Sequence, residues 1–171
     1  MKPLSLLVKI VLFGTLLLSA CGYKPSSKYA KEVLGNSIST KVIVSMEDPE
    51  NSVVVKDAVD TAVVQTFQAN LTDKKNALTH LSISLSEPTY TPVQYDNNGY
   101  VIGYRATVVL SILRSSKDIK KIYSSKGSYD FSVLPNAVLS DKERFDAIKF
   151  SSIKAISAFV AKVSAEGSRV K

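Results

Sequence analysis

Few side chains of this sequence have the chemistry for catalysis or metal binding. Histidine occurs once, as His80, which leaves no histidine pair for zinc. The only cysteine, Cys21, follows an N-terminal leader and is expected to be lipidated there, which leaves no cysteine–histidine couple. Acidic pairs such as Asp141 with Glu143 fall in turns and helix caps, where a local role explains them. No phosphate-binding glycine loop and no G-x-S-x-G motif occurs. The sequence therefore predicts a protein that is not an enzyme, with no catalytic residue, no metal site and no cofactor.

The single cysteine has a distinctive context. An apolar run follows Lys2 and covers residues 4–8 and 10–18, with Lys9 between the two parts. The run is shorter than a membrane span of about 20 residues and is typical of a signal peptide. Leu-Ser-Ala precedes Cys21, and this pattern resembles the lipobox of bacterial lipoproteins. We expect Cys21 to carry acyl chains after residues 1–20 are removed. The alternative is a buried free cysteine behind an uncleaved anchor helix.

The composition is that of an ordinary globular domain. Among 171 residues, 45% are hydrophobic and 22% are charged, which excludes a collagen, a disulfide scaffold and wholesale disorder. The formal net charge is +7, and the chain stays basic after loss of Lys2 and Lys9. A basic chain favours acidic partners such as phosphate-bearing lipid, nucleic acid or an acidic protein surface. Export and the lack of a basic-aromatic recognition motif argue against nucleic acid.

Hydrophobic periodicity gives the order of the secondary-structure elements. We divide the chain into a signal peptide (1–20), a lipidated N-terminus with a tether (21–36) and one domain (37–171). The expected elements of that domain are a strand at 38–46, a helix at 53–71, a strand at 81–85 with an extension to 95, a hairpin turn at 96–99, a strand at 100–113, a basic turn at 114–121, a strand at 122–133, and a helix that begins at the Ser140–Glu143 capping box and ends at Gly167.

This β-α-β-β-β-α order predicts an α+β two-layer sandwich, with two helices on one face of a four-stranded mixed sheet. The other face is expected to be polar, because serines alternate along two of the strands. The residues concerned are Ser82, Ser84 and Ser86, and Ser124, Ser125, Lys126 and Ser128. Such a face is either a hydrogen-bonding contact surface or a plain solvated side of an antiparallel sheet.

Three features together resemble the LPS-assembly lipoprotein LptE family: the Cys21-Gly22-Tyr23 start, the element order with a first strand that ends before Asp48-Pro49, and the tyrosine-rich hairpin at 95–104. The resemblance implies a lipid-anchored, periplasm-facing protein of the Gram-negative outer membrane. It implies a plug that sits inside the β-barrel LptD, helps that barrel to assemble and takes part in lipopolysaccharide delivery to the cell surface. The alternative is a lipoprotein binding module that activates a periplasmic cell-wall synthase.

Two sets of residues are candidates for contacts under this resemblance. Tyrosines suit mixed polar and apolar interfaces, and those expected to touch the barrel are Tyr90, Tyr95, Tyr100 and Tyr104; the alternative is that they pack within the hairpin or cap the core. Basic side chains suit lipopolysaccharide phosphates, and those expected to contact them are Arg105, Arg114, Lys117, Lys120, Lys121 and Lys126. The alternative for the basic set is a solvated charged face.

Overall fold

The structure is a computed structural model that describes residues 26–43, 53, 55–57, 59–61, 64, 68–117, 119–135 and 137–169. Its elements are α2 (Ser26–Leu34), β1 (Ser37–Ile43), β2 (Asn70–Leu71), β3 (Thr79–Leu85), β4 (Thr89–Tyr95), β5 (Val101–Ser116), β6 (Ile119–Ser132) and α4 (Asp141–Arg169). The described residues between 53 and 64 are helical.

The long strand β5 organises the sheet. Strand β6 pairs with it antiparallel over almost its whole length, from Gly103↔Ser132 to Ser116↔Ile119. The opposite edge of β5 pairs first with β4 and then with β3, both antiparallel. Strand β1 lies parallel to β3, and the short β2 lies parallel to β1. The sheet is therefore mixed, as predicted, with β5 at its centre.

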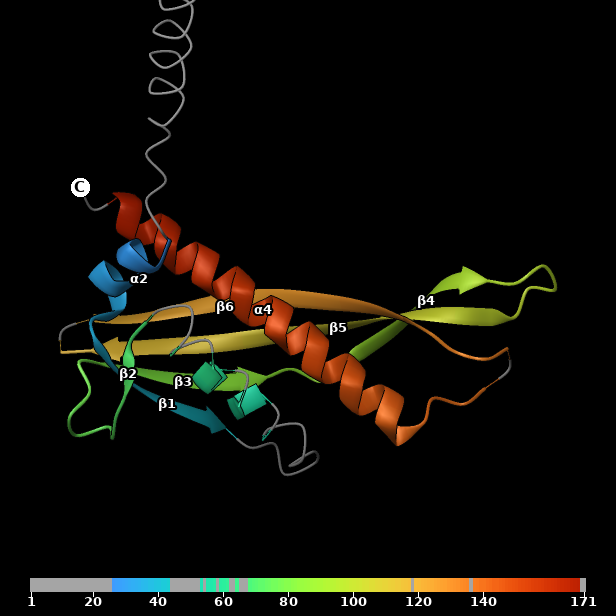
Figure 1. The fold of residues 1–171 in the computed structure, drawn as a ribbon, viewed down its shortest axis with the longest axis horizontal. Coiled ribbons are helices and arrows are strands. Elements are labelled where there is room, and N and C mark those ends of the chain that lie inside the picture. Colours follow the sequence, from blue (N-terminus) through green and yellow to red (C-terminus); the bar gives the residue numbers. More distant parts are fainter. Residues whose placement is uncertain are drawn as a thin grey trace, which may run out of the picture.

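One face of the sheet carries the core. Figure 1 shows α4 crossing that face diagonally, with α2 beside its C-terminal end. Alternate residues of β3 and β5 point under the helix, because successive side chains of a strand alternate between faces. The largest fully buried side chains include Leu81, Ile83, Val108, Leu110 and Ile112. The sequence predicts a buried stripe of Phe145, Ile148, Ser152, Ile156, Phe159 or Val160, and Val163 on this helix. All of these residues are buried except Phe145, which is 40% exposed.

Two glycines mark where α4 comes closest to its neighbours. A Cβ atom at Gly127 of β6 would lie 2.0 Å from the Ser151 carbonyl oxygen and 2.4 Å from the Ala155 nitrogen. A Cβ atom at Gly167 would lie 2.2 Å from the carbonyl oxygen of Tyr29 in α2. Any side chain at these positions would push backbone away from backbone, so the two glycines set the spacing of α4 on β6 and on α2.

Local signals read from the sequence are confirmed. The Ser140 nitrogen donates to Glu143 Oε2 at 2.8 Å and the Glu143 nitrogen donates to Ser140 Oγ at 3.3 Å, which is the expected capping box at the start of α4. At the hairpin turn, Asp96 Oδ1 accepts from the nitrogens of Asn98 and Tyr100, and Gly99 has φ +83°. These interactions span only a few residues, so the sequence contains all that is needed to predict them.

The architecture has more elements than expected. The sheet contains six strands, because the segment 81–95 forms two separate strands and Leu71, expected in a helix, lies in β2. A further helix, α2, lies in the segment expected to be a tether. Its residues Ala30 and Leu34 are buried, and Gly35 ends it with φ +79°. A nine-residue helix is marginal alone, so its packing on α4 supplies the stability that its composition did not predict.

Three expectations about the longer elements were wrong. Arg114, Ser115 and Ser116 continue β5, so the predicted basic turn at 114–121 is reduced to the link between β5 and β6. Gly167 lies inside α4 and does not end it. Ser125 faces α4 and is buried, whereas its strand neighbours Ser124 and Lys126 are exposed as predicted. The end of the predicted strand 38–46, beyond residue 43, falls outside the described residues. The described residues of the predicted helix 53–71 are helical up to residue 64, whereas residues 68–71 are not.

Candidate functional site

Part of the sheet extends past α4, and we call it the arm. It consists of β4, residues 101–107 of β5 and residues 128–132 of β6 (Figure 1). Cross-strand register places four aromatic residues on the α4 side of the arm: Tyr90 pairs with Ala106, Ala106 with Tyr129, and Tyr104 with Phe131. None of the helices formed by the described residues covers the outer part of this face, so its side chains must stabilise one another.

Phe131 is the centre of that aromatic cluster. Its ring centroid lies 6.2 Å from Tyr104, 6.3 Å from Tyr129 and 6.4 Å from Tyr90, with the Tyr90 ring edge-on at 87°. Aromatic pairs at these separations contribute about 0.5–1.5 kcal/mol beyond the burial of their area. Tyr129 also meets Phe150 of α4 at 4.8 Å, which connects the arm to the helix.

The tip of the arm exposes two tyrosines. Tyr95 is 57% exposed and Tyr100 is 45% exposed, one on each side of the Asp96–Gly99 turn, and Val93 beside them is 43% exposed. The structure thus divides the four tyrosines predicted to contact a barrel. Tyr90 and Tyr104 belong to the cluster around Phe131, and Tyr95 and Tyr100 present their rings to the outside.

The sheet face opposite α4, the open face, is polar and largely uncovered. Its serines include the predicted Ser82, Ser84, Ser124 and Ser128, with Ser111 of β5 between them. Ser128 shares a hydrogen bond with Thr107 at 3.0 Å. Ser86, also predicted here, lies just past β3, where its Oγ accepts from the Val109 nitrogen at 3.1 Å. The face can therefore offer hydroxyl groups to a partner.

Arg105 and Asp130 form an ion pair on the arm's share of the open face. Nε and Nη2 of Arg105 each donate to one oxygen of Asp130 at 2.7 Å. The hydrogen bond and charge of Asp130 raise the pKa of Arg105, and the same contact lowers the pKa of Asp130. Both side chains are about half exposed, so this pair is screened by solvent. Arg105 already has a carboxylate partner and is not a free phosphate contact.

The predicted basic cluster does not form one site. Arg105 and Arg114 are nine positions apart along β5, a distance of about 30 Å at the rise of a strand, and the two side chains lie on opposite faces of the sheet. Lys126 lies on the open face between them. Only Lys117, Lys120 and Lys121 lie together, at the link between β5 and β6.

Arg114 belongs to an interior group that joins the end of α4 to the sheet. Its side chain is 7% exposed, and Nη1 donates to Tyr123 Oη at 3.3 Å and to Glu166 Oε1 at 3.4 Å. Lys121 Nζ and Tyr123 Oη donate to Glu166 Oε2 at 2.6 and 2.8 Å. Arg114 Nε is buried without a partner. No local sequence signal predicts this group, because Arg114 and Glu166 are 52 positions apart.

Ionisation within this group follows from its contacts. Partial burial pushes the pKa of Glu166 up, but hydrogen bonds from Lys121 and Tyr123 and the charges of Lys121 and Arg114 together bring it below its usual value. Burial raises the pKa of Tyr123. The hydrogen bond to Glu166 raises the pKa of Lys121. Glu166 is therefore an anion that neutralises cations beneath α4, and the group has a structural role.

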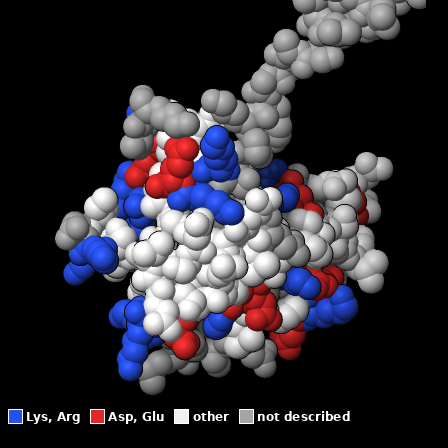
Figure 2. Space-filling view, turned by 60° about the vertical axis from the view of Figure 1, so that its left-hand side comes forward, with Lys and Arg blue, Asp and Glu red and all other residues white. Residues whose placement is uncertain are grey.

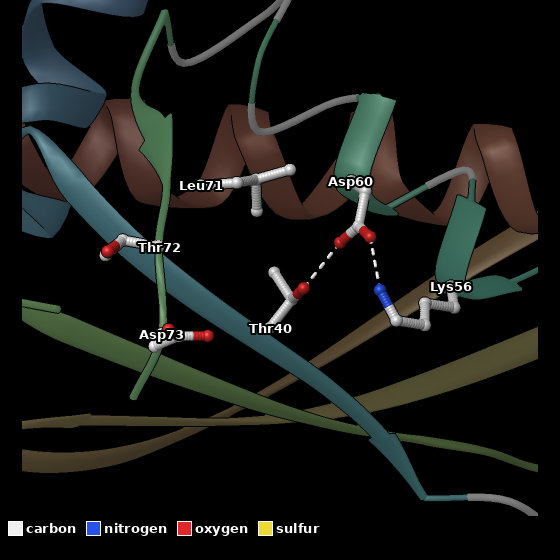
Figure 3. A pocket seen from close by; sticks show the side chains of 6 residues that line it. All are labelled: Thr40, Lys56, Asp60, Leu71, Thr72 and Asp73. Carbon is white, nitrogen blue, oxygen red and sulfur yellow. Dashed lines mark hydrogen bonds and ion pairs between the residues drawn. The ribbon is translucent and has the colours of Figure 1, made fainter. Parts of the chain in front are cut away.

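A hollow of about 540 Å³ lies beside β1 and β2 (Figure 3). Asp60 points into it and is hydrogen-bonded by Thr40 and ion-paired with Lys56. Its other lining residues are Leu71, Thr72 and Asp73. Asp60 already has a cation and a hydroxyl donor as partners, so the hollow is a poor candidate for a reactive site.

Other features bear on what the surface can do. No helix among the described residues is long and apolar enough to cross a membrane. Within the same residues, no three His, Cys, Asp or Glu side chains are grouped to hold a metal ion. Cys21, the predicted lipidation site, falls outside the described residues.

Solved structures provide a comparison at the level of the fold. Rare lipoprotein B from Shewanella oneidensis superposes with a TM-score of 0.52 at 14% identity, over 79% of this chain and 98% of that one. A minor lipoprotein from Acinetobacter baumannii (8% identity, 77% and 92% coverage) and lipoprotein B from Nitrosomonas europaea (11%, 78% and 84%) each reach a TM-score of 0.48. No protein-family model and no curated protein sequence matches the chain.

The chain thus shares its fold with a bacterial lipoprotein. Because the identity is low, this comparison establishes the architecture and leaves the function to be argued. The fold expected from the sequence resemblance is confirmed, because the chain superposes on rare lipoprotein B over 98% of that chain.

Proposed function

We propose that this protein is an outer-membrane lipoprotein, acylated on Cys21, that plugs and helps to assemble an LptD-like β-barrel and so takes part in lipopolysaccharide delivery. It acts by contact and performs no bond chemistry. The observation that carries the proposal is the fold shared with rare lipoprotein B, which spans 98% of that chain. The lipobox before Cys21 and the sequence resemblance to the LptE family support it independently.

The surfaces of the domain fit the demands of a plug. The interior of a large membrane barrel is polar and wet, so a plug needs hydroxyl and charged groups outside and aromatic anchors at points of close contact. The open face supplies serines such as Ser84 and Ser124. The tip supplies Tyr95 and Tyr100, exposed on a rigid hairpin. The proposal therefore assigns barrel contact to the tip and the open face.

We assign lipopolysaccharide delivery to the complex with the barrel and not to one basic site on this chain. Arg114 is buried, Arg105 is paired with Asp130, and Lys121 is paired with Glu166. Of the remaining exposed members, Lys117 and Lys120 lie together at the link between β5 and β6, whereas Lys126 lies apart from them on the open face. A phosphate group would therefore meet lysines, without the planar fork that an exposed arginine offers.

Photo-crosslinking in cells tests this assignment. A photoreactive amino acid replaces Tyr95 in one variant and Tyr104, which packs in the aromatic cluster, in a matched control. The account expects Tyr95 to yield a crosslink to a large outer-membrane barrel, identified by mass, and Tyr104 to yield much less. A crosslink from Tyr95 to a peptidoglycan synthase would contradict the proposal and favour the cell-wall alternative.

A further inference from the structure

Positive charge is concentrated at one end of the domain, which we call the basic end. Backbone and side-chain contacts bring its parts together. Glu166 of α4 meets Lys121 of β6, and Gly167 packs on Tyr29 of α2. The loop after β2 is held by hydrogen bonds at Ser37, and the start of β3 pairs with the last residue of β5. These elements surround one end of the sheet.

The cations of this end outnumber its described acids. Its exposed or half-exposed basic residues are Lys28, Lys31, Lys74, Lys75, Lys117, Lys120, Lys121 and Arg169. The described acids there are Glu32, Asp73 and Glu166, and Glu166 is committed to the interior group. Asp118 falls outside the described residues. Figure 2, which brings this end forward, shows Lys and Arg side chains around its rim.

The opposite end of the molecule is different. The exposed or half-exposed carboxylates Asp96, Asp130, Asp141, Glu143 and Asp146 lie on the arm or on the first turns of α4, mostly next to a cation such as Arg105 or Lys142. The positive excess of the chain is therefore polarised toward the basic end. A polarised charge distribution orients a protein at a charged surface.

The chain length before α2 brings this end to a membrane. Only residues 22–25 separate Cys21 from Ser26, the first residue of α2, so the acyl-bearing residue lies within about 18 Å of that helix. Strand β5 alone is about 50 Å long, so the tip of the arm can lie much farther away. A tether this short leaves the basic end beside the lipid headgroups, although it permits the domain to tilt.

We infer that the basic end docks on anionic phospholipid headgroups of the leaflet that holds the acyl chains, so that on a bilayer without the barrel the arm points away from the lipid. The inference rests on the proposed acylation of Cys21 but does not depend on the barrel. Basic residues next to a lipid anchor provide the second, electrostatic signal that fixes a domain at a membrane surface. Here that signal selects one orientation of the domain.

Site-specific fluorescence on the full, lipidated chain tests the orientation. Lys117→Cys at the basic end or Asn97→Cys at the tip carries a dye, and vesicles carry a headgroup quencher. Vesicles contain phosphatidylethanolamine with phosphatidylglycerol, phosphatidylcholine alone, or phosphatidylcholine with lipopolysaccharide. We expect at least twofold stronger quenching at position 117 with phosphatidylglycerol than with phosphatidylcholine, a loss of that difference at 1 M salt, and weak quenching at position 97 throughout.

Charge variants of equal size complete the test. Lys74→Gln, Lys75→Gln and Lys120→Gln together should remove the dependence on phosphatidylglycerol, whereas Lys126→Gln, Lys142→Gln and Lys149→Gln together should leave it unchanged. Equal effects of the two triple variants would overturn the inference. A response to lipopolysaccharide without one to phosphatidylglycerol would also overturn it. The mass of the N-terminal peptide separately shows whether Cys21 is acylated, so a failure of docking is distinguished from a failure of the proposed function.

Discussion

The two halves of the β5–β6 ribbon have different environments. In the body, these strands lie under α4 and contribute Val108, Leu110 and Ile112 to the core. In the arm, the same strands run beyond the helix and hold half-buried rings such as Tyr104 and Phe131. The difference indicates that the body determines folding stability, whereas the arm presents a surface that packs on itself and can also receive a partner.

Glycine substitutions should separate the body from the arm most strongly. Gly127→Ala places a Cβ against backbone of α4, so we expect a loss of about 3 kcal/mol in the free energy of unfolding. Gly103→Ala on the arm meets mainly the Gln94 side chain, 3.0 Å away, and should cost about 1 kcal/mol or less. Urea denaturation measures both. Equal losses would contradict the assignment of stability to the body.

The two arginine–carboxylate pairs provide the next test. Glu166→Gln leaves the buried Arg114 without its counter-charge and should lower the free energy of unfolding by about 2 kcal/mol. Asp130→Asn on the solvent-exposed arm pair should have no measurable effect. The pKa of Glu166 is lowered in the fold, so its contribution is present above pH 4.5, its usual value, and is lost as pH falls through the lower folded value. In the Glu166→Gln variant, the free energy of unfolding should therefore fall less steeply as the pH is lowered.

The free energy of local unfolding should also distinguish the arm from the body, with a smaller difference than the preceding variants. Phe131→Leu removes ring contacts with three tyrosines and should ease opening of the arm by about 1.5 kcal/mol. Ile112→Val in the core should cost about 1 kcal/mol of global stability. Amide hydrogen exchange reads both. In Phe131→Leu, we expect faster amide exchange in the arm alone. If exchange accelerated equally in the body, the arm would not open separately.

The smallest expected effect is a shift in the pKa of His80, caused by the electric field of the lysines at the basic end. Burial, followed by the charges of Lys74 and Lys41, lowers the pKa of His80 from 6.5. A lowered histidine pKa stabilises the fold above pH 6.5, and that stability is lost as pH falls through the folded value. An NMR titration of the only histidine should show Lys74→Gln raising the pKa and Lys154→Gln, near the arm, leaving it unchanged. If Lys74→Gln left the pKa of His80 unchanged, the electric field of the basic end would not reach the body of the domain.

The sequence predicted those features that depend on neighbouring residues. The Ser140–Glu143 cap, the Asp96–Gly99 turn and the alternation of Leu81 and Ile83 are all local, and all were found. The α+β class and the polar open face followed from the same patterns. Helix α2 was missed because nine residues rich in serine and lysine become a stable helix only against α4.

Contacts between distant residues account for the other differences. Gly167 resembled a helix end, but its small size is required by Tyr29 of α2. Arg114 resembled part of a basic turn, but Glu166 and Tyr123 hold it beneath α4. Periodicity and composition contain no information about these partners. The candidate contact residues were therefore predicted by residue type. Only the structure separated the exposed Tyr95 and Tyr100 from the half-buried Tyr90 and Tyr104, and the exposed lysines from the buried Arg114.

Purification from outer membranes shows whether the lipidated chain binds a large β-barrel. The tagged, lipidated full chain is isolated in mild detergent and its partners are identified by mass, beside a Tyr95→Ala, Tyr100→Ala double variant that should fold normally. We expect a large β-barrel to be recovered with the natural chain in an amount equal to that of the chain itself. The amount of barrel recovered with the variant should be severalfold lower. Recovery of the natural chain without any barrel, or with a peptidoglycan synthase in its place, would contradict it.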